Sequence, residues 1–564
     1  FHFDDAPNIV ENYKLRDLSN FWPPSGLRWF GGLTFALNYY FGGLNVAGYH
    51  IVNLIIHIFN AILVYWLVIF TFRTPFFSYQ QSEVSSQDNL KTYLPLFIAL
   101  LFVAHPIQTQ AVTYIVQRFT SLATMLYLLS LVMYIKARLE VKAKVKFFSA
   151  STLTFYIFSL ISAILAMKTK EISFTLPVII ALYEFMFFEG NNKRRILYLL
   201  PLLLTMLIIP LSLVGIDKPI GDTIGELREA AQETDAIPRW SYLFTQFRVI
   251  VTYIRLLVLP INQNLDYDYP LYHSFFNPEV FLSFLFLLPL IGFGIYLLYR
   301  SRFTSHASRL TAFGIFWFFI TLSVESSIIP IKDVTNEHRL YLPSLGIIIV
   351  FVLTTFYVLR LVIRAPLRFL TITCLLLTTI IIALSIAAYQ RNAVWQNEVS
   401  LWEDVVRKSP NKVRGYNNLG NAYRYKGWVD KAIEHYQIAL RLKPTCVDAH
   451  NGLAVAYDNK GWVDKAIVHY QIALRLQPYA EAYNNLGVIY GNRGLLDKAI
   501  EHFQIALSLN PNHAGFYTNL GIFYEKKGLQ DEAIKQYQTA LRLNPEYNIA
   551  RNNLNRVLQI QRSK

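Results

Sequence analysis

The sequence is poor in charged residues and in cysteine. Charged side chains make up only 16% of the 564 residues, whereas hydrophobic ones make up 54%. This balance excludes an ordinary soluble globular protein and is typical of a membrane protein. Cys374 lies in an apolar run and Cys446 in a polar region, and the sequence has no other cysteine. A disulfide framework and a thiolate metal site are therefore excluded as well.

Apolar runs long enough to cross a bilayer recur along the first two thirds of the chain. A span needs about 20 residues, because the hydrocarbon core is about 30 Å thick. We predict ten spans, at residues 48–72, 93–112, 118–136, 147–167, 172–188, 196–215, 279–299, 310–329, 340–360 and 369–388. The run 241–259 carries two arginines and is expected to lie in the outer interface. Since the chain opens without Met or a signal-like segment, we also expect a further helix upstream.

The net charge of +15 is concentrated in short loops between the predicted spans. Lys and Arg gather around residues 73–91, 136–146, 193–195, 300–309 and 360–368, whereas Asp and Glu gather in the longer, alternate loops. The basic loops are therefore expected on the cytoplasmic side. A positive charge with this distribution sets orientation and does not favour a nucleic-acid partner. An even number of spans places the first loop and the C-terminal region together on the non-cytoplasmic side.

A repeat of about 34 residues follows the last predicted span. Prolines 410, 444, 478, 511 and 545 are 34, 34, 33 and 34 residues apart, which is the period of tetratricopeptide repeats. Each interval repeats one pattern of aromatic and small residues, seen first as Tyr416, Leu419, Gly420, Tyr423, Ala432, Tyr436, Ala439 and Pro444. The pattern predicts paired helices that stack into a superhelix with a concave groove.

The predicted architecture is all-α, with a polytopic membrane domain followed by an α-solenoid. The membrane domain covers residues 1–388, and residues 1–47 form its first external loop. Residues 389–410 are a linker and a degenerate half repeat, 411–545 are four tetratricopeptide repeats, and 546–564 are a capping helix and tail.

Two adjacent carboxylates, Asp4 and Asp5, stand in the opening segment FHFDDAPNIVENY. A structural interpretation is a solvated loop or a helix cap near Pro7. Polar residues also stand at the ends of apolar runs in LFVAHPIQTQAVTYIVQR (101–118), LAMKTKEISFTLP (165–177), LDYDYP (265–270) and TNEHRLYLPSLG (335–346). Ionisable groups at a membrane boundary are costly unless they face water or headgroups, so this set predicts a wet, functional cavity.

These segments, in this order, resemble a known family. FDDAPNIVEN, GGLNVAGYHIVNLIIH, LFVAHPIQTQAV, KTKE, NEHRLYLPSLG and the repeats look like the transmembrane and tetratricopeptide-repeat O-mannosyltransferases. The resemblance extends to the protein mannosyltransferases of the GT-C superfamily and covers essentially the whole chain. It implies a GT-C-like membrane fold, a polyprenyl-phosphate-linked sugar as donor, mannose as the sugar, and a protein or peptide acceptor. The acidic pair of the family is often Asp-Glu, whereas this chain has Asp-Asp.

The acidic pair fits the chemistry that the resemblance implies. A Ser or Thr hydroxyl is a weak nucleophile, so its attack on an anomeric carbon requires a general base. We predict Asp4 as that base, with Asp5 as its orienting neighbour or as a ligand to the acceptor. The resemblance implies no required cofactor or metal, although Mg²⁺ or Mn²⁺ held by the pair and phosphate oxygens stays an alternative.

The leaving phosphate requires fixed positive charge. The resemblance assigns this role to Arg339, Lys170 and Arg118. It places Glu171, His105 and Glu337 in supporting positions. Each of these residues also has a structural alternative. Arg118 and Lys170 could contact lipid headgroups, Glu337 and Arg339 could form a boundary ion pair, and His105 could end a helix.

A column of amides marks the first helices of the repeats. Its members are Asn417, Asn451 and Asn484 at one position, and Asn418, Asn485 and Asn519 at the next. Such a column can hydrogen-bond the backbone of an extended peptide whatever its side chains. The alternative is a solvated concave face, but we expect acceptor binding.

Two other functions fit parts of the sequence. An O-oligosaccharide ligase, or another GT-C enzyme that modifies lipid or glycan, would place key residues in a large late loop, but the loop 216–278 lacks a cationic cluster with histidine. A membrane-anchored repeat scaffold would need no acidic pair. The absence of any Asn-x-Ser/Thr sequon favours a bacterial inner membrane with periplasmic repeats over the endoplasmic reticulum with lumenal repeats.

Overall fold

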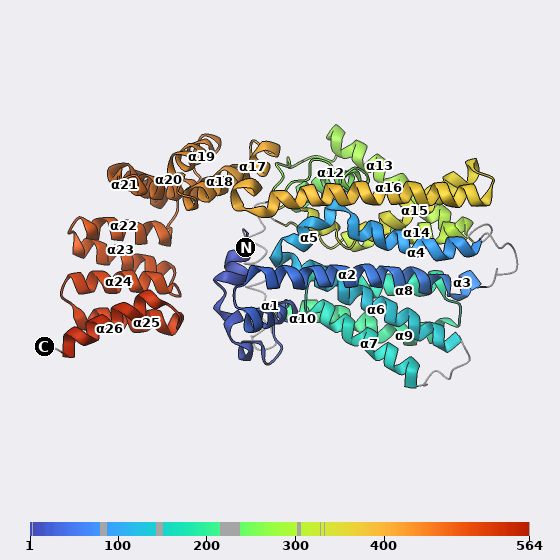
Figure 1. Cartoon of the computed structure of the whole chain (residues 1–564), viewed down its shortest axis with the longest axis horizontal. Coiled ribbons are helices and arrows are strands. Elements are labelled where there is room, and N and C mark those ends of the chain that lie inside the picture. Colours follow the sequence, from blue (N-terminus) through green and yellow to red (C-terminus); the bar gives the residue numbers. More distant parts are fainter. Residues whose placement is uncertain are drawn as a thin grey trace. The chain divides into compact units, whose positions relative to one another are not determined.

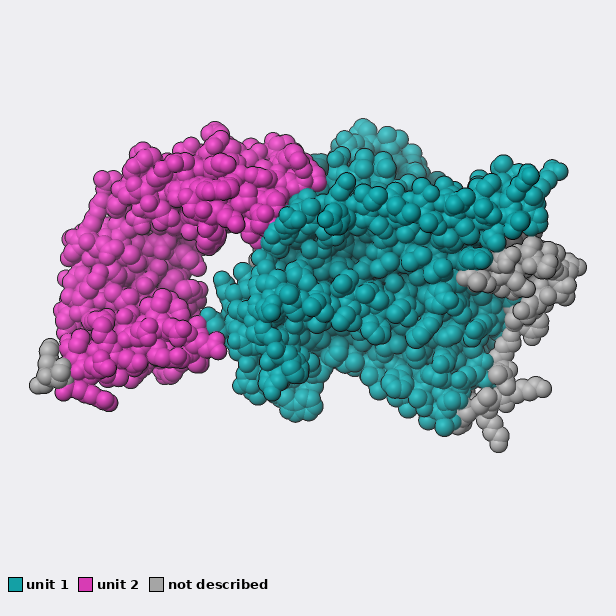
Figure 2. All heavy atoms as spheres, in the orientation of Figure 1, with its two compact units in different colours: residues 1–265, 269–396 teal, residues 266–268, 397–564 magenta. Residues whose placement is uncertain are grey.

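The protein is described by a computed structural model at residues 1–2, 4–78, 87–142, 150–214, 237–301, 306–327, 329–331 and 333–562. Within these ranges the chain is helical and has no strand. It divides into two compact units (Figure 2). We call residues 1–265 and 269–396 the membrane unit, and residues 266–268 and 397–564 the repeat unit. The predicted all-α class, with apolar helices and helical repeats, is confirmed.

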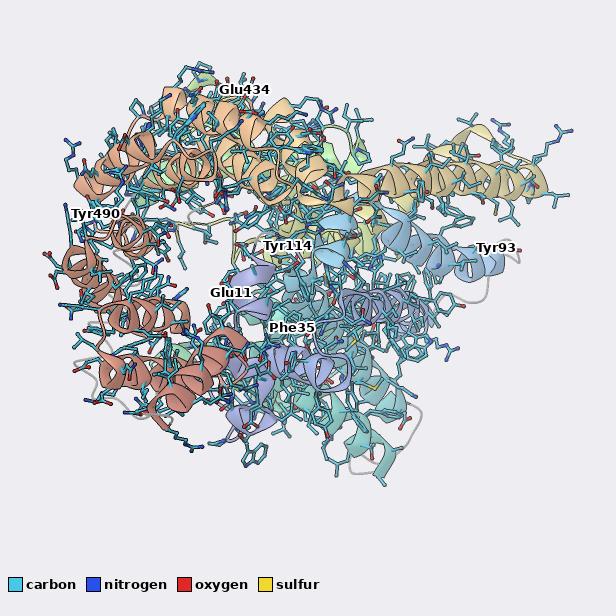
Figure 3. All side chains as sticks on the ribbon, turned by 60° about the vertical axis from the view of Figure 1, so that its left-hand side comes forward. Glu11, Phe35, Tyr93, Tyr114, Glu434 and Tyr490 are labelled. Carbon is cyan, nitrogen blue, oxygen red and sulfur yellow. The ribbon has the colours of Figure 1, made fainter. Side chains whose placement is uncertain are left out.

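The membrane unit begins with short helices that are fixed by a small core of their own. These are η1 (Ala6–Val10), η2 (Tyr13–Arg16) and η3 (Leu18–Phe21), followed by α1 (Trp29–Gly42). The Asp17 carboxylate starts η3 by accepting a hydrogen bond from the Ser19 backbone N–H. Buried apolar side chains from this segment pack with the start of the next helices: Ile9, Leu15, Phe35, Ala36, Tyr49 and Ile115, of which Phe35 is labelled in Figure 3.

Seven helical stretches of the described chain are long and apolar enough to cross a membrane. They are α2 (Val46–Phe72), η5 (Ile115–Gln117) with α6 (Arg118–Lys142), α7 (Ala150–Met167), α9 (Asn192–Leu204) with η7 (Thr205–Leu207) and α10 (Ile208–Val214), α13 (Pro278–Arg300), α15 (Ser344–Val362), and α16 (Pro366–Ala393) with η9 (Val394–Gln396). Their length and composition make the chain an integral membrane protein.

The other three predicted spans take a different form. The span predicted at 93–112 is α4 (Gln87–Ala104) followed by η4 (Pro106–Gln108) and α5 (Thr109–Thr113), with a bend of 50°. The bend falls at Pro106, which has no N–H to donate and keeps the preceding residue extended.

The remaining two predicted spans correspond to shorter helices. The one at 310–329 is α14 (His306–Leu322), and the one at 172–188 is η6 (Glu171–Thr175) followed by α8 (Leu176–Phe187). The 12 residues of α8 cover only about 18 Å. Counting the bent pair, the described residues hold up to eight spans, and the number ten stays a prediction.

The helices of the membrane unit pack mainly along their lengths. The helix α2 packs on α4 and α6, α6 packs on α7, and α14 packs on α13 and α15 (Figure 1). The amphipathic run predicted at 241–259 forms α12 (Arg239–Val258), which packs on α13. The remaining elements are α3 (Pro75–Ser78) and η8 (Glu337–Leu340). Residues 147–149 of a predicted span, 216–236 of the loop 216–278, and parts of the basic loops at 143–146 and 302–305 lie outside the described residues.

A charged network is buried between α6 and α8. The Glu184 carboxylate is fully buried and accepts hydrogen bonds from Arg138 Nε at 2.9 Å, Arg138 Nη2 at 2.7 Å and the Tyr134 hydroxyl at 3.0 Å. The Arg195 guanidinium lies 3.8 Å away. The carboxylate is satisfied by these donors, and its removal would leave a buried guanidinium without its counter-charge.

Replacing Glu184 by Gln is therefore expected to destabilise the protein by about 3–5 kcal/mol, because it leaves the buried Arg138 guanidinium without a compensating negative charge. The measurement is thermal unfolding of the purified protein in detergent. Glu279→Gln is the matched control, because its pair with Arg248 is exposed at the surface and is expected to contribute less than about 1 kcal/mol. Equal effects of the two substitutions would contradict this account of the network.

The repeat unit is a row of antiparallel helix pairs. It begins with α17 (Glu398–Lys408) and continues with α18 (Val413–Tyr425) and α19 (Val429–Leu442), α20 (Val447–Asn459) and α21 (Val463–Leu476), α22 (Ala480–Asn492) and α23 (Leu496–Leu509), α24 (Ala514–Lys526) and α25 (Gln530–Leu543), and α26 (Asn548–Arg562) (Figure 1). Each first helix packs closely on its second helix because a small residue faces an aromatic ring. A Cβ atom added at Gly420 would stand 2.7 Å from the Tyr436 ring.

Candidate active site

The membrane unit contains a cavity of about 910 Å³. Its polar lining residues are Asp4, Asn8, Arg28, Gln117, Lys170, Glu171, Ser323, Glu325, Ser327, Asn336, His338 and Arg339. Its apolar lining residues are Val116, Phe119, Phe174, Ile209, Pro210, Val324, Ile329 and Ile331. Folding therefore brings four of the predicted site residues, Asp4, Lys170, Glu171 and Arg339, from distant parts of the sequence to one space.

The first of the two carboxylates faces this cavity. The backbone N–H of Asp4 donates to the Tyr114 hydroxyl at 2.8 Å, and the Asp4 carbonyl accepts from Asn8 Nδ2 at 2.8 Å. Burial, together with the charges of both aspartates, raises the pKa of Tyr114, which therefore stays a neutral phenol (Tyr114 is labelled in Figure 3). These contacts fix the backbone on both sides of the Asp4 side chain.

The second carboxylate points into the protein. Asp5 is fully buried, and its two carboxylate oxygens accept hydrogen bonds from the backbone N–H groups of Val116 and His2, each at 2.8 Å. The Asp5 side chain thus ties the opening segment to the start of η5. The two neighbouring aspartates occupy different environments, one at the cavity and one in the interior.

The environment of Asp5 predicts a pH dependence of stability. Burial raises its pKa from 3.8 to about 6. Since the folded protein holds this proton more tightly than the unfolded chain, the stabilisation is fully present below pH 3.8 and is lost as the pH rises through about 6. The loss amounts to about 3 kcal/mol at about 1.4 kcal/mol for each pKa unit.

Thermal unfolding of the wild type and of Asp5→Asn tests this dependence. Between about pH 4 and pH 6.5, the wild type is expected to lose stability relative to the variant, which has no proton to release at this position. Parallel pH profiles of the two proteins would contradict the assignment.

Two ion pairs line the cavity. The buried Lys170 ammonium donates to Thr120 Oγ1 at 2.8 Å and lies 3.2 Å from a Glu325 carboxylate oxygen. Arg28, which is about half exposed, pairs with Glu171 at 3.1 Å. Both pairs join residues that are more than 140 positions apart in sequence. The two pairs thus place two cations and two counter-carboxylates among the lining residues of the cavity.

Arg339 lines the cavity but uses its guanidinium to hold the adjacent loop. It donates to the backbone carbonyls of Asp333 at 2.6 Å, Val334 at 3.1 Å and Glu325 at 3.4 Å. These bonds hold the backbone at Glu325, Asp333 and Val334, and residues 323–325 belong to the lining of the cavity. The neighbouring His338 also lines the cavity, and its Nδ1 atom is buried without a partner. Burial and the charges of Lys170, Arg339 and Arg28 hold the pKa of His338 well below its usual value.

Arg118 is not among the residues that line the cavity. Its fully buried guanidinium donates to the side-chain oxygens of Asn53 at 2.7 Å and Asn38 at 2.8 Å, and to the Tyr49 carbonyl at 3.1 Å. It also stacks on the Phe35 ring at 4.3 Å. These contacts make it a link between α1, α2 and α6.

His105 and Glu337 likewise make internal contacts. His105 accepts a hydrogen bond from the Ile107 backbone N–H at 3.1 Å, which caps η4 at the bend. The buried Glu337 carboxylate accepts from the Asn264 backbone N–H at 2.6 Å. In this geometry both residues support the backbone around the cavity.

Several cavity residues were not predicted from the sequence. Arg28, Glu325 and His338 are among them. His338 stands within the motif TNEHRLYLPSLG and could have been found there. Arg28 and Glu325 become candidates only because they pair with Glu171 and Lys170, which are far away in the sequence. A single sequence does not show such long-range pairs.

No group of three or more His, Cys, Asp or Glu residues that could hold a metal ion occurs in the described parts of the chain. Residues Asp266–Asp268 of the LDYDYP motif belong to the repeat unit, where the Asp266 carboxylate accepts two hydrogen bonds from Arg414, each at 2.7 Å.

The amides of the predicted column lie on α18, α20, α22 and α24. In the last two repeats they bond to one another. Asn484 Nδ2 donates to Asn485 Oδ1 at 3.1 Å, and Asn519 Nδ2 donates across the repeat boundary to Asn484 Oδ1 at 2.9 Å. The column is therefore continuous between these two repeats.

Fold and site together define an integral membrane protein with an internal cavity of carboxylates and cations, joined to a helical-repeat unit. Tetratricopeptide-repeat models match residues 480–513 and 502–535, and a TPR-repeat model matches residues 420–461. Among solved structures, the crystal structure of MamA is 33% identical over 26% of this chain and 87% of that chain, with a TM-score of 0.24.

The predicted family resemblance is confirmed by relatives that also cover the membrane unit. The chain is 25% identical over 482 residues to the mouse protein named "Protein O-mannosyl-transferase TMTC3", which covers 77% of this chain and 48% of that protein. It is 24% identical over 505 residues to the Drosophila melanogaster protein named "Protein O-mannosyl-transferase Tmtc3", which covers 78% of this chain and 52% of that protein. The chain thus spans about half the length of the curated relatives it matches.

Proposed function

We propose that the protein is a membrane glycosyltransferase that moves mannose from a polyprenyl phosphate to Ser or Thr hydroxyls of acceptor proteins. The observation that carries this proposal is the meeting of Asp4 and Lys170 at one cavity that is lined by both charged and apolar residues. The names of the relatives supply the sugar and the class of acceptor.

Asp4 is the proposed general base. In the reaction, the acceptor hydroxyl oxygen forms a bond to the anomeric carbon as the bond from that carbon to the phosphate oxygen breaks. The hydroxyl proton passes to the Asp4 carboxylate, and the electron pair of the broken bond stays on the phosphate. Asp5 is a positioning residue, because its hydrogen bonds to Val116 and His2 hold the segment that carries Asp4.

Lys170 is the proposed partner of the leaving phosphate. A fixed cation in a site partly closed to water stabilises the negative charge that develops as the sugar–phosphate bond breaks. Glu325 and Thr120 hold the ammonium in place before the donor arrives. Arg28 adds a second cation at the same cavity. Arg339 contributes by holding the backbone of Glu325, Asp333 and Val334 through bonds to their carbonyls.

The apolar residues that line the cavity favour a lipid-linked donor. Phe174, Ile209, Pro210, Ile329 and Ile331 line the same cavity as the two cations. A polyprenyl phosphate has the same two parts, an apolar chain and an anionic group. A nucleotide-linked sugar has a polar nucleoside where the lipid-linked donor has its apolar chain. Placing that nucleoside against the apolar lining residues is unfavourable without hydrogen-bond partners.

The proposed orientation follows from the charge bias between spans. Short basic loops on the cytoplasmic side place the segment of Asp4 and the repeats on the other side of the membrane, in the periplasm of a bacterium or in the lumen of the endoplasmic reticulum. The repeats are the proposed binding site for the acceptor.

Sugar transfer by the purified protein tests the proposal. The protein in lipid nanodiscs is incubated with polyprenyl-phosphate mannose and a Ser/Thr-rich peptide, and the peptide is analysed by mass spectrometry. We expect a hexose on Ser or Thr with this donor and none with a nucleotide-linked mannose. Absence of transfer from the lipid donor, with the peptide still bound, would favour a scaffold.

A further inference from the structure

The asparagine column of the repeat unit is interrupted in its first half. The column consists of Asn417, Asn418, Asn451, Asn484, Asn485 and Asn519. In the described part of the repeat unit, four buried side-chain polar atoms have no hydrogen-bond partner, namely Asn417 Oδ1, Asn418 Nδ2, Arg424 Nε and Asn451 Oδ1. All four lie on α18 and α20. Buried polar atoms are nearly always paired in native proteins, so these unpaired atoms on two neighbouring helices are candidate contacts for a ligand.

The sequence explains why the side-chain oxygen of Asn417 has no donor. In the last two repeats, the amide of Asn519 donates to the oxygen of Asn484 in the repeat before it. The residue that should donate to Asn417 in the same way, one repeat earlier, is Gly452. A side chain cannot be placed at this position, because a Cβ atom at Gly452 would lie 2.5 Å from the Tyr436 ring. The oxygen of Asn417 therefore lacks the donor that its counterpart has.

The unpaired side-chain oxygen of Asn451 has a related cause. By position in the repeat, its donor should be the amide of Asn485. That residue instead accepts from Asn484 at 3.1 Å and also bonds with Tyr470. In the first repeat, Asn417 Nδ2 donates to Asn418 Oδ1 at 3.4 Å, as Asn484 does to Asn485, but Asn417 Oδ1, Asn451 Oδ1 and Asn418 Nδ2 have no hydrogen-bond partner.

We propose that an extended segment of the acceptor polypeptide binds at α18 and α20 and supplies these missing partners from its backbone. Peptide N–H groups donate to Asn417 Oδ1 and Asn451 Oδ1, and a peptide carbonyl accepts from Asn418 Nδ2. This inference rests on the proposed function, since it takes the ligand to be the acceptor protein. The contacts use only backbone groups, so recognition tolerates many acceptor sequences.

The spacing of the helices suits an extended chain. Packed helices lie about 8–10 Å apart, and an extended peptide advances about 3.3 Å per residue. The amides of consecutive repeats would therefore meet backbone groups about three residues apart. Asn417 is 8% exposed, so its oxygen becomes satisfied only by a group that enters the column.

Peptide binding to the full-length protein tests this inference. The probe is a fluorescently labelled, uncharged peptide of Ser, Thr and Ala, and fluorescence anisotropy is measured without donor. The double variant Asn417→Ala with Asn451→Ala is expected to weaken binding about tenfold, because it removes two hydrogen bonds. The matched control, Asn459→Ala with Asn492→Ala, removes two exposed amides of α20 and α22 that lie outside the column, and it should change the affinity less than about twofold. Circular dichroism on heating confirms that both variants keep the repeats folded.

A peptide with methylated backbone nitrogens separates backbone recognition from all other modes. It keeps every side chain but cannot donate to Asn417 and Asn451, and we expect it to bind about tenfold more weakly than its parent. Equal binding of both peptides, equal effects of the two double variants, or no binding by the wild type would overturn the inference.

Transfer assays distinguish this failure from a failure of the proposed function. If the wild type transfers sugar and the Asn417/Asn451 variant has an unchanged KM for the peptide, the inference is wrong and the proposed function stands. If the Asn417/Asn451 variant binds the peptide more weakly than the control variant but the wild type transfers no sugar, the proposed function is wrong and the binding site stands.

Discussion

Asp4→Asn is expected to lower turnover by about 10²–10⁴-fold, the range over which a positioned general base contributes. The substitution keeps the size of the side chain but removes its ability to take a proton. The Asp4 backbone binds Tyr114 and Asn8, and its carboxylate also interacts with the Tyr114 hydroxyl. Because the side-chain oxygen of asparagine can accept the same hydrogen bond, we expect little change in stability. The measurement is the initial rate of labelled mannose transfer to a peptide.

Glu11→Gln is the matched control for Asp4→Asn. Glu11 is an exposed acid of the same segment and does not line the cavity, so its substitution should leave the rate within about twofold. A normal rate for Asp4→Asn would contradict the assignment of the base. A lower rate with an equal loss of thermal stability would make Asp4 a structural residue.

Lys170→Met is expected to lower turnover by about 10²–10³-fold, because it removes a fixed cation at the position proposed for the leaving phosphate. It also leaves Glu325 without its partner, so the double variant with Glu325→Gln is measured beside it. If Lys170 acts on the phosphate, the double variant stays as slow as the single one. Recovery of the rate in the double variant would show that the ion pair is only structural.

Lys168→Met is the control for Lys170→Met. Lys168 lies two positions away and donates to Ser212 Oγ at 2.7 Å, outside the set of residues that line the cavity. Its loss should leave the rate of transfer within about twofold of the wild type.

The repeat unit was the part of the fold most open to prediction from sequence. Each helix pair buries residues at fixed local spacing, such as Gly420 against Tyr436, so a period of about 34 residues is visible in a single sequence. The membrane spans were visible by apolar length, but the break at Pro106 and the short α8 were not, because length alone does not show how a segment crosses the bilayer.

The candidate site was predictable in part. Lys170 lies in a motif at the end of an apolar run, where polar groups are costly, and the family resemblance supplies the roles of Asp4 and Lys170. The sequence could not show that Asn38 and Asn53 bind the Arg118 guanidinium, or that the carbonyls of Glu325, Asp333 and Val334 bind Arg339. Such pairings depend on contacts between residues far apart in the chain. The orphaned amides beside Gly452 also emerge only when neighbouring repeats are compared in space.

A structure of the protein with a non-reactive phosphonate analogue of polyprenyl-phosphate mannose would show where the donor binds. We expect the phosphonate within hydrogen-bond distance of Lys170 Nζ, the anomeric carbon facing the Asp4 carboxylate, and the lipid along Phe174, Ile209 and Ile331. An analogue bound elsewhere in the membrane unit, with the cavity of Asp4 and Lys170 left empty, would contradict this expectation.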